Sequence, residues 1–355
     1  MPTYTVEEAK NLLARLPRTS LGFYPTPLHK LERLSAELGV NIYLKRDDLS
    51  GVSTFGGNKM RKLEYLLGDA LAQGADTVFT YGATQSNHAM QTVAAACKCG
   101  LHPVLYLVSV VEPDKETLRA NLLLDYIYGA EVHIVQMEPG EEEADAETRS
   151  FAMGAEHVKR LRAEGKHPYD VPMGGASPVG SVGFAGGFVE LEEQCASAGI
   201  KPDYLYHASG TGGTLAGLAA GRALLGADMH IVSVAVSPKD EGYEARTADL
   251  ANRALGVIGA SNDVRVSAED LQVERGYFAP GYEIPNEWGN GAIRRLARTE
   301  GVLMDTVYSG KAFGGLLDHI ERGIVPQGST VVFWHTGGAT ALFSEPQIIG
   351  DLAQA

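Results

Sequence analysis

The chain has 355 residues, of which 45% are hydrophobic and 21% charged, so it is long enough and apolar enough for two globular domains. Its formal net charge of −14 argues against nucleic acid or an anionic membrane surface as a partner, and any basic cluster is expected to bind a small anion. The sequence shows neither a run of about 18 apolar residues nor a basic and apolar leader, so we expect a cytoplasmic protein without a membrane segment. The three cysteines, Cys97, Cys99 and Cys195, fit neither a disulfide framework nor a zinc site of the CxxC type.

Strands and helices are expected to alternate along the chain. The predicted segments are a strand at 41–47; a strand, turn, helix and strand at 76–109; a strand at 130–136; a helix from the acidic stretch 138–147 to about Glu164; a strand, glycine loop, helix and strand at 202–237; and a strand, polar turn and helix start at 329–343. This alternation is typical of parallel sheets that are covered by helices on both faces.

The stretch "GGNKMRKLEYLL" at 56–67 predicts a helix from Lys62 onward, with Asn58 as a cap at its start. Apolar residues recur along it at three- and four-residue steps, namely Leu63, Leu66, Leu67, Ala70 and Leu71. Lys59, Arg61 and Lys62 then crowd the positive end of the helix, which costs roughly 0.3–1 kcal/mol per charge unless an anion lies there. A solvated cationic face is the alternative.

Four polar, glycine-rich loops follow predicted strands or open predicted helices, at 56–59, 84–88, 209–214 and 335–338. In open α/β sheets such loops converge on one crevice. The 209–214 loop, "SGTGGT", has the ingredients of a phosphate cradle, although a plain tight turn is the alternative. It is not a dinucleotide fingerprint, because Leu215 takes the sixth position of the GxGxxG pattern. A phosphate loop together with a lysine that can act as a covalent amine points to pyridoxal phosphate as the cofactor.

Six motifs then carry a family resemblance: "GGNKMRKLEYLLGDALAQGAD", "QSNHAMQT", "SGTGGTLAGL", "GYEIPNEWGNGAI", "DTVYSGKAFGGL" and "HTGGATALF". Over 26–343 the chain resembles the D-cysteine desulfhydrases, which are grouped with L-cysteate sulfo-lyases and aminocyclopropanecarboxylate deaminases among the fold-type II, tryptophan-synthase-β-like pyridoxal phosphate enzymes. The resemblance implies two three-layer α/β/α domains with mostly parallel sheets, a small one at 56–169 and a large one formed by 1–55 and 170–355. It also implies a homodimer.

The resemblance further implies roles for matching residues. Lys59 would bond the cofactor aldehyde and move the Cα proton, Lys62 would lie near the phosphate, and Thr336 would hydrogen-bond the pyridine nitrogen. The phosphate cradle would consist of Ser209, Gly210, Thr211, Gly212, Gly213 and Thr214. The remaining positions are Asn87 at the ring hydroxyl, Ser86 and His88 at the substrate, and Tyr282 and Tyr308 beside cofactor and substrate. Without the resemblance, Ser86 reads equally well as a helix cap and the two tyrosines as core aromatics.

Two departures from the deaminase pattern bear on the reaction. Ser309 and Thr336 stand where the deaminases have Glu and Leu, and a neutral hydroxyl at the ring nitrogen favours prompt expulsion of a β leaving group. We therefore expect a β-sulfur group to leave a cysteine-like amino acid, giving an aminoacrylate that hydrolyses to pyruvate and ammonia. D-cysteine is slightly preferred over L-cysteate, with the deaminase reaction third, and Met90 replaces an arginine that is common in the desulfhydrases and sulfo-lyases. A nucleotide-binding oxidoreductase or a ligand-binding regulator with a similar sheet is the alternative of another class.

Overall fold

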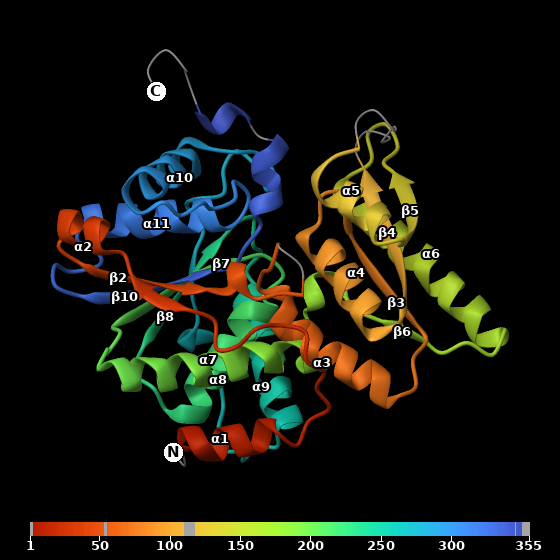
Figure 1. The fold of residues 1–355 in the computed structure, drawn as a ribbon, viewed down its shortest axis with the longest axis horizontal. Helices are drawn as coiled ribbons and strands as arrows, with labels where there is room; N and C mark the ends of the chain where they lie inside the picture. The colour runs from red at the N-terminus through yellow and green to blue at the C-terminus, as the bar shows by residue number, and fades with distance from the viewer. Residues whose placement is uncertain (1–2, 53–54, 110–117, 345, 350–355) are drawn as a thin grey trace.

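The computed structural model describes residues 3–52, 55–109, 118–344 and 346–349, and its strands form two separate sheets (Figure 1). The larger has the order β1-β2-β10-β7-β8-β9, with bounds Leu28–Lys30, Asn41–Arg46, Thr330–His335, Tyr204–Ser209, His230–Ala235 and Gln272–Glu274. The smaller has the order β5-β4-β3-β6, with bounds Glu131–Gln136, His102–Ser109, Thr77–Ala83 and Pro168–Asp170. All neighbouring strands are parallel except β1 and β2.

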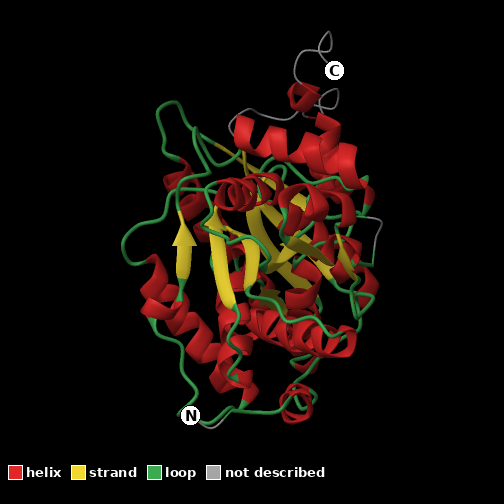
Figure 2. Cartoon of the chain, turned by 90° about the vertical axis from the view of Figure 1, so that its left-hand side faces the viewer, coloured by secondary structure: helices red, strands yellow, loops and turns green. Residues whose placement is uncertain are grey.

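Helices cover both faces of the larger sheet (Figure 2). Alternate residues of β10 enter opposite cores, since Val332 and Trp334 pack with α7, α8 and α9 whereas Val331 and Phe333 pack with α2, α10 and α11. These helices are α2 (Glu32–Leu38), α7 (Pro178–Ala198), α8 (Gly213–Leu225), α9 (Tyr243–Ile258), α10 (Glu287–Glu300) and α11 (Ser309–Glu321), and α1 (Val6–Leu13) lies against α7. The continuous apolar strands therefore arise from burial on both sides, as the sequence predicted.

The smaller sheet is also a three-layer unit. On one side lie α3 (Lys59–Ala72), α4 (Asn87–Cys99) and α5 (Ala120–Ile127), and on the other lies α6 (Glu143–Ala163). The expected fold class, two α/β units with mostly parallel sheets, is confirmed. The residue bounds proposed for the two domains stay a prediction. None of the described helices is long and apolar enough to cross a membrane.

The helix that carries the predicted lysines differs in three details from its prediction. It begins at Lys59 and not at Lys62, and Asn58 precedes it without a capping hydrogen bond from its side chain. Leu71 is 41% exposed, while the other four apolar positions are buried. Of the cysteines, Cys97 is exposed and Cys99 half-buried at the end of α4, whereas Cys195 in α7 is buried.

Arg61 points away from the proposed phosphate site into a buried ion cluster. Its guanidinium donates to both carboxylate oxygens of Asp47 at 2.7 and 2.8 Å and to Glu190 at 2.9 and 3.0 Å. Lys45 on β2 also pairs with Glu190 on α7. Burial alone would raise the pKa of Glu190, but hydrogen bonds and charge from Arg61 and Lys45 lower it to about 2. The cluster thus fastens α3 to the larger sheet. The anions that neutralise Arg61 are the carboxylates of Asp47 and Glu190, and not a bound ligand.

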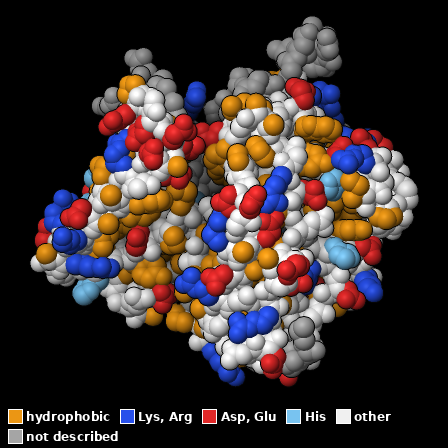
Figure 3. All heavy atoms as spheres, turned by 180° about the vertical axis from the view of Figure 1, so that it is seen from behind, with side chains coloured by type: hydrophobic (Ala, Val, Ile, Leu, Met, Phe, Trp, Pro, Cys, Tyr) orange, Lys and Arg blue, Asp and Glu red, His pale blue; other side chains and the backbone are white. Residues whose placement is uncertain are grey.

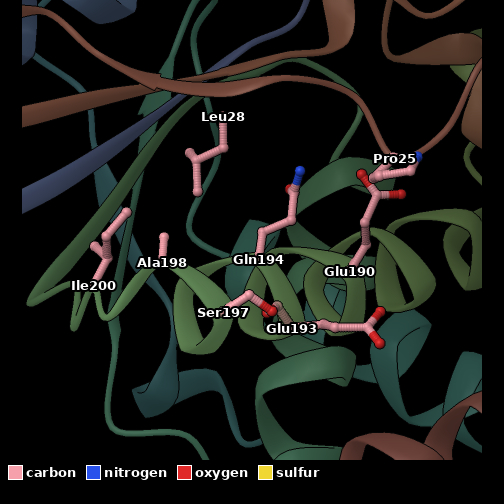
Figure 4. A pocket seen from close by; sticks show the side chains of 8 residues that line it. All are labelled: Pro25, Leu28, Glu190, Glu193, Gln194, Ser197, Ala198 and Ile200. Carbon is pink, nitrogen blue, oxygen red and sulfur yellow. The ribbon is translucent and has the colours of Figure 1, made fainter.

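A pocket of about 460 Å³ opens beside this cluster. Figure 4 shows Glu190 and Gln194 projecting from α7 toward Pro25 and Leu28. None of the predicted site residues lines this pocket, so we assign it no part in the candidate site. On the face of the molecule in Figure 3, side chains of both charges are interspersed.

Substitution Arg61→Ala is expected to lower the free energy of unfolding by about 3–5 kcal/mol, because it leaves buried carboxylates without their cation. Urea unfolding followed by circular dichroism measures the change. The matched control is Arg253→Ala, whose exposed pair with Asp249 contributes about 0.5 kcal/mol or less. Equal losses in both variants would contradict the structural role assigned to the cluster.

Candidate active site

Two glycine loops from opposite ends of the chain meet directly at the start of α3. Gly57 forms a bridge with Gly337, and the backbone N–H of Asn58 donates to the carbonyl of Thr336 at 3.1 Å. A Cβ at Gly337 would lie 2.7 Å from the carbonyl oxygen of Gly56, so only glycine permits this approach. The contact brings predicted residues Lys59 and Thr336 into one region.

The Lys59 amine is linked to the 209–214 loop through Asn58. Lys59 Nζ donates to Asn58 Oδ1 at 2.8 Å, and Asn58 Nδ2 donates to Thr214 Oγ1 at 3.2 Å. Burial lowers the pKa of Lys59 to about 8, although the nearby charge of Asp305 opposes the shift. At pH 7 roughly a tenth of such amines are uncharged, against roughly one in three thousand at the ordinary lysine pKa. Lys59 is therefore poised to act as a nucleophile or base.

The ammonium of Lys62 is buried without a carboxylate partner among the described residues. It is 1% exposed and donates to the carbonyl of Gly174 at 2.9 Å. Burial and the neighbouring charge of Lys59 lower its pKa well below the usual range. A Cβ at Gly213, the first residue of α8, would lie 3.0 Å from Lys62 Nζ. A lysine amine thus lies beside the positive end of a helix, and a bound anion would stabilise both the helix end and the charged form of the amine.

The loop before α8 has free donors for a phosphate, except at Ser209, whose hydroxyl contacts Tyr243. Gly212 has φ +88° and no side chain caps α8, so no capping side chain satisfies the N–H groups of its first turn. Thr211 is exposed and lies against Gly174, and Gly210 lies near Tyr308. Tyr243, however, donates to the carbonyl of Gly210 and is 2.7 Å from Ser209 Oγ. The Ser209 hydroxyl is therefore held by Tyr243, which the sequence did not identify.

The predicted substrate residues at the start of α4 differ in orientation. Ser86 accepts from the N–H of Ala89 at 3.2 Å, so the alternative of a helix cap is confirmed. Asn87 Oδ1 accepts from Asn121 at 2.8 Å and from Thr340 at 3.3 Å, which leaves its amide N–H groups to donate. His88 is 4% exposed and its Nε2 lies 2.8 Å from Thr80 Oγ1 on β3. The structure thus places Ser86 and Asn87 at the loop, but directs the His88 ring into the protein.

Met90 is 1% exposed within α4. Its side chain therefore belongs to the packing of that helix.

The two predicted tyrosines face one another. Their hydroxyls are hydrogen-bonded and their rings are perpendicular, with centroids 5.7 Å apart. Lys59 Nζ lies 6.0 Å from the centroid of the Tyr308 ring, so this pair borders the amine. Burial raises the pKa of Tyr308, which keeps its hydroxyl protonated.

Lys311, which sequence reasoning missed, holds the segment that carries Tyr282. It is fully buried, and its ammonium donates to the carbonyls of Phe278, Gly281 and Tyr282 at 3.2, 2.7 and 3.0 Å. Burial lowers the pKa of Lys311 to about 8, and Asp305 opposes the shift. Its position directly after "YSG" is the one sequence signal that could have identified it. The three carbonyls that it binds cannot be predicted from a local pattern.

The position predicted to face the pyridine nitrogen holds two hydroxyls. Ser309 Oγ donates to the carbonyl of Gly337 at 3.1 Å and lies 3.2 Å from Thr336 Oγ1. Asp305, also missed from the sequence, accepts the backbone N–H groups of Val307, Tyr308 and Ser309 at 2.7–2.9 Å. This carboxylate is fully buried and fixes the turn that presents Tyr308 and Ser309.

These observations fit pyridoxal phosphate. The Lys62 ammonium and the uncapped start of α8 would hold its phosphate. The Lys59 amine is close to this place, because the Asn58 side chain hydrogen-bonds both Lys59 and Thr214 of α8. Asn87 offers amide donors, and Ser309 and Thr336 offer neutral hydroxyls. The roles of the individual residues stay predictions.

Comparison with known proteins agrees with this site. A family model described as pyridoxal-phosphate dependent enzyme matches residues 19–337. The chain is 40% identical over 335 residues to a D-cysteine desulfhydrase of Salmonella paratyphi C, covering 94% of this chain and 97% of the relative. It is 41% identical over 333 residues to a Pyrococcus abyssi protein provisionally named as a 1-aminocyclopropane-1-carboxylate deaminase, covering 94% of each chain.

Solved structures place the fold in the same group. The crystal structure of an ACC deaminase homologue is similar with a TM-score of 0.83 and 37% identity, covering 95% of this chain and 96% of that one. A pyridoxal 5'-phosphate-dependent aspartate racemase shares the fold, with a TM-score of 0.63, 14% identity and coverage of 98% and 99%. Pyridoxal phosphate is accordingly the cofactor, and the fold is that of the fold-type II enzymes. The chain belongs to the pyridoxal-phosphate dependent enzyme family.

Proposed function

We propose that the protein is a carbon-sulfur lyase that removes a β-sulfur group from a cysteine-like amino acid, with D-cysteine as the first substrate to test. Pyruvate, ammonia and hydrogen sulfide would be the products. The observation that carries the proposal is the pair of neutral hydroxyls, Ser309 and Thr336, at the place predicted for the ring nitrogen. The relatives named D-cysteine desulfhydrase support the choice of substrate.

The bound cofactor supplies an electron sink next to the substrate Cα. The residues of this chain then have separable tasks. Lys59, whose pKa is lowered to about 8 chiefly by burial, takes the Cα proton. Lys62 and the start of α8 hold the phosphate so that the amine and the reacting carbon stay aligned. Tyr282 and Tyr308 close the side of the site beside Lys59 and hold the leaving group in place.

A second candidate activity is the opening of 1-aminocyclopropane-1-carboxylate. The Pyrococcus relative and the ACC deaminase homologue carry names that favour it. A glutamate after the tyrosine would protonate the ring nitrogen and deepen the electron sink, and this chain has Ser309 there. Elimination is therefore preferred, and L-cysteate, which would release sulfite, is a further substrate to test.

We also propose that the enzyme works as a cytoplasmic homodimer, as the resemblance implies. On the surface of α5, Leu123, Tyr126 and Ile127 are 39%, 45% and 68% exposed. An apolar face of this kind is what a second copy would cover.

Substitution Lys59→Ala is expected to abolish the absorption band near about 410–420 nm that marks a cofactor bonded to a lysine amine. The cofactor phosphate should still bind, because Lys62 and the 209–214 loop remain. Absorption spectra and phosphate content of purified protein test both points. An unchanged band would exclude Lys59 as the bonding amine, and Lys201→Ala, at an exposed lysine, is the control.

The substrate assignment predicts more than tenfold higher activity with D-cysteine than with 1-aminocyclopropane-1-carboxylate. D-cysteine, L-cysteine, L-cysteate and the cyclopropane are offered separately, and pyruvate, sulfide, sulfite and 2-oxobutyrate are measured. Sulfite from L-cysteate as the main product would identify the sulfo-lyase. Predominant 2-oxobutyrate would overturn the elimination proposal.

Lys311 is proposed to position Tyr282, and Lys311→Met should lower kcat/KM by about tenfold while the cofactor band persists. If Lys311 acts through Tyr282, the effects of Lys311→Met and Tyr282→Phe will not add in the double variant. Steady-state kinetics on the four proteins measure the coupling, with Lys201→Met as the control. Additive effects would show that Lys311 supports only the fold.

A further inference from the structure

A cluster of metal-binding residue types lies on the smaller sheet, outside the site described above. β5 is an edge strand of this sheet, and Figure 1 shows β5 and α6 on the side away from the larger sheet. Glu131 and His133 are two residues apart on β5, so both side chains lie on the same face. Helix α6 covers this face of the sheet, and its His157 lies next to Glu131 and His133.

One carboxylate is shared by several imidazoles. Glu131 Oε1 lies 2.7 Å from His133 Nε2 and 4.0 Å from His157 Nδ1. His102 Nε2 lies 3.2 Å from the other oxygen of Glu131. The ligand atoms of Glu131, His133 and His157 all lie within 4.8 Å of one another.

Aromatic side chains pack against two of these rings. His133 stacks on Tyr106 with centroids 4.5 Å apart and an interplanar angle of 10°. The His157 and Phe79 rings are perpendicular with centroids 5.1 Å apart, and His157 Nδ1 lies 3.1 Å from the Tyr106 hydroxyl. The His157 side chain is only 6% exposed, so this is more than a solvated surface pair.

We propose that Glu131, His133 and His157 bind one divalent transition-metal ion of the Zn²⁺ class, with His102 as the outer hydrogen-bond partner of Glu131. Two imidazoles, a carboxylate and a water form a common tetrahedral zinc set. Metal bonds of about 2.0–2.1 Å require the ligand atoms to approach to roughly 3.4 Å, which rotation of the half-exposed Glu131 and His133 side chains can provide. The ion would fasten edge strand β5 to α6.

The test uses the enzyme with its cofactor bound, dialysed against EDTA and then titrated with ZnCl₂ in a calorimeter. We expect one equivalent of Zn²⁺ per chain in the wild type and in the control His230→Ala, at an exposed histidine outside the cluster. Glu131→Gln and His133→Ala should each weaken this binding at least tenfold, since even outer partners of metal ligands contribute about 10–100-fold. The unchanged cofactor band confirms that each variant is folded.

Thermal unfolding gives a second readout. Zn²⁺ should raise the Tm of the wild type and of His230→Ala, but not of His133→Ala, because the ion binds only the folded cluster. The proposal is overturned if the wild type binds no Zn²⁺. It is equally overturned if all four proteins bind it alike, since the ion would then lie at the cofactor or at a cysteine.

Discussion

A buried lysine with no carboxylate partner in the described part of the chain is the constraint on which the site depends. Lys62 lies desolvated beside Lys59 and the positive end of α8, and the carbonyl of Gly174 is its acceptor. Such a group is costly to bury unless an anion accompanies it, and a phosphorylated cofactor supplies that anion. The same desolvation lowers the pKa of Lys59 toward neutrality. One physical cause therefore prepares both the phosphate site and the reactive amine.

The lysines can hold this arrangement because α3 is fixed to the rest of the protein at Arg61. Asp47 directly follows β2 of the larger sheet and Glu190 lies on α7, which packs against that sheet, and both bind this one guanidinium. These ion pairs hold α3, which carries Lys59 and Lys62, in one position relative to the larger sheet. The bridge between Gly57 and Gly337 adds a backbone contact at the same place. Stability and alignment thus share the same contacts.

The tyrosine side of the site is shaped by two buried charged residues that hydrogen-bond backbone groups. Asp305 accepts three N–H groups before α11, and Lys311 donates to three carbonyls of the 278–282 segment. Together they fix where Tyr308, Ser309 and Tyr282 lie. The hydroxyl character of Ser309 and Thr336 then sets the electronic environment proposed for the cofactor ring.

The sequence by itself determined the parallel α/β class, seven of the ten described strands, the glycine loops and the cofactor, because apolar periodicity, glycine spacing and ordered motifs are local properties of the chain. It did not predict the three-residue strands β1, β6 and β9, which are too short to show a periodic pattern. Tertiary structure decided the partners of individual side chains. Arg61 binds Asp47 and Glu190, Ser209 is held by Tyr243, and His88 turns toward Thr80. Each of these contacts depends on the fold bringing groups from distant segments to within about 3 Å of one another. The local sequence of one helix or loop does not contain that information.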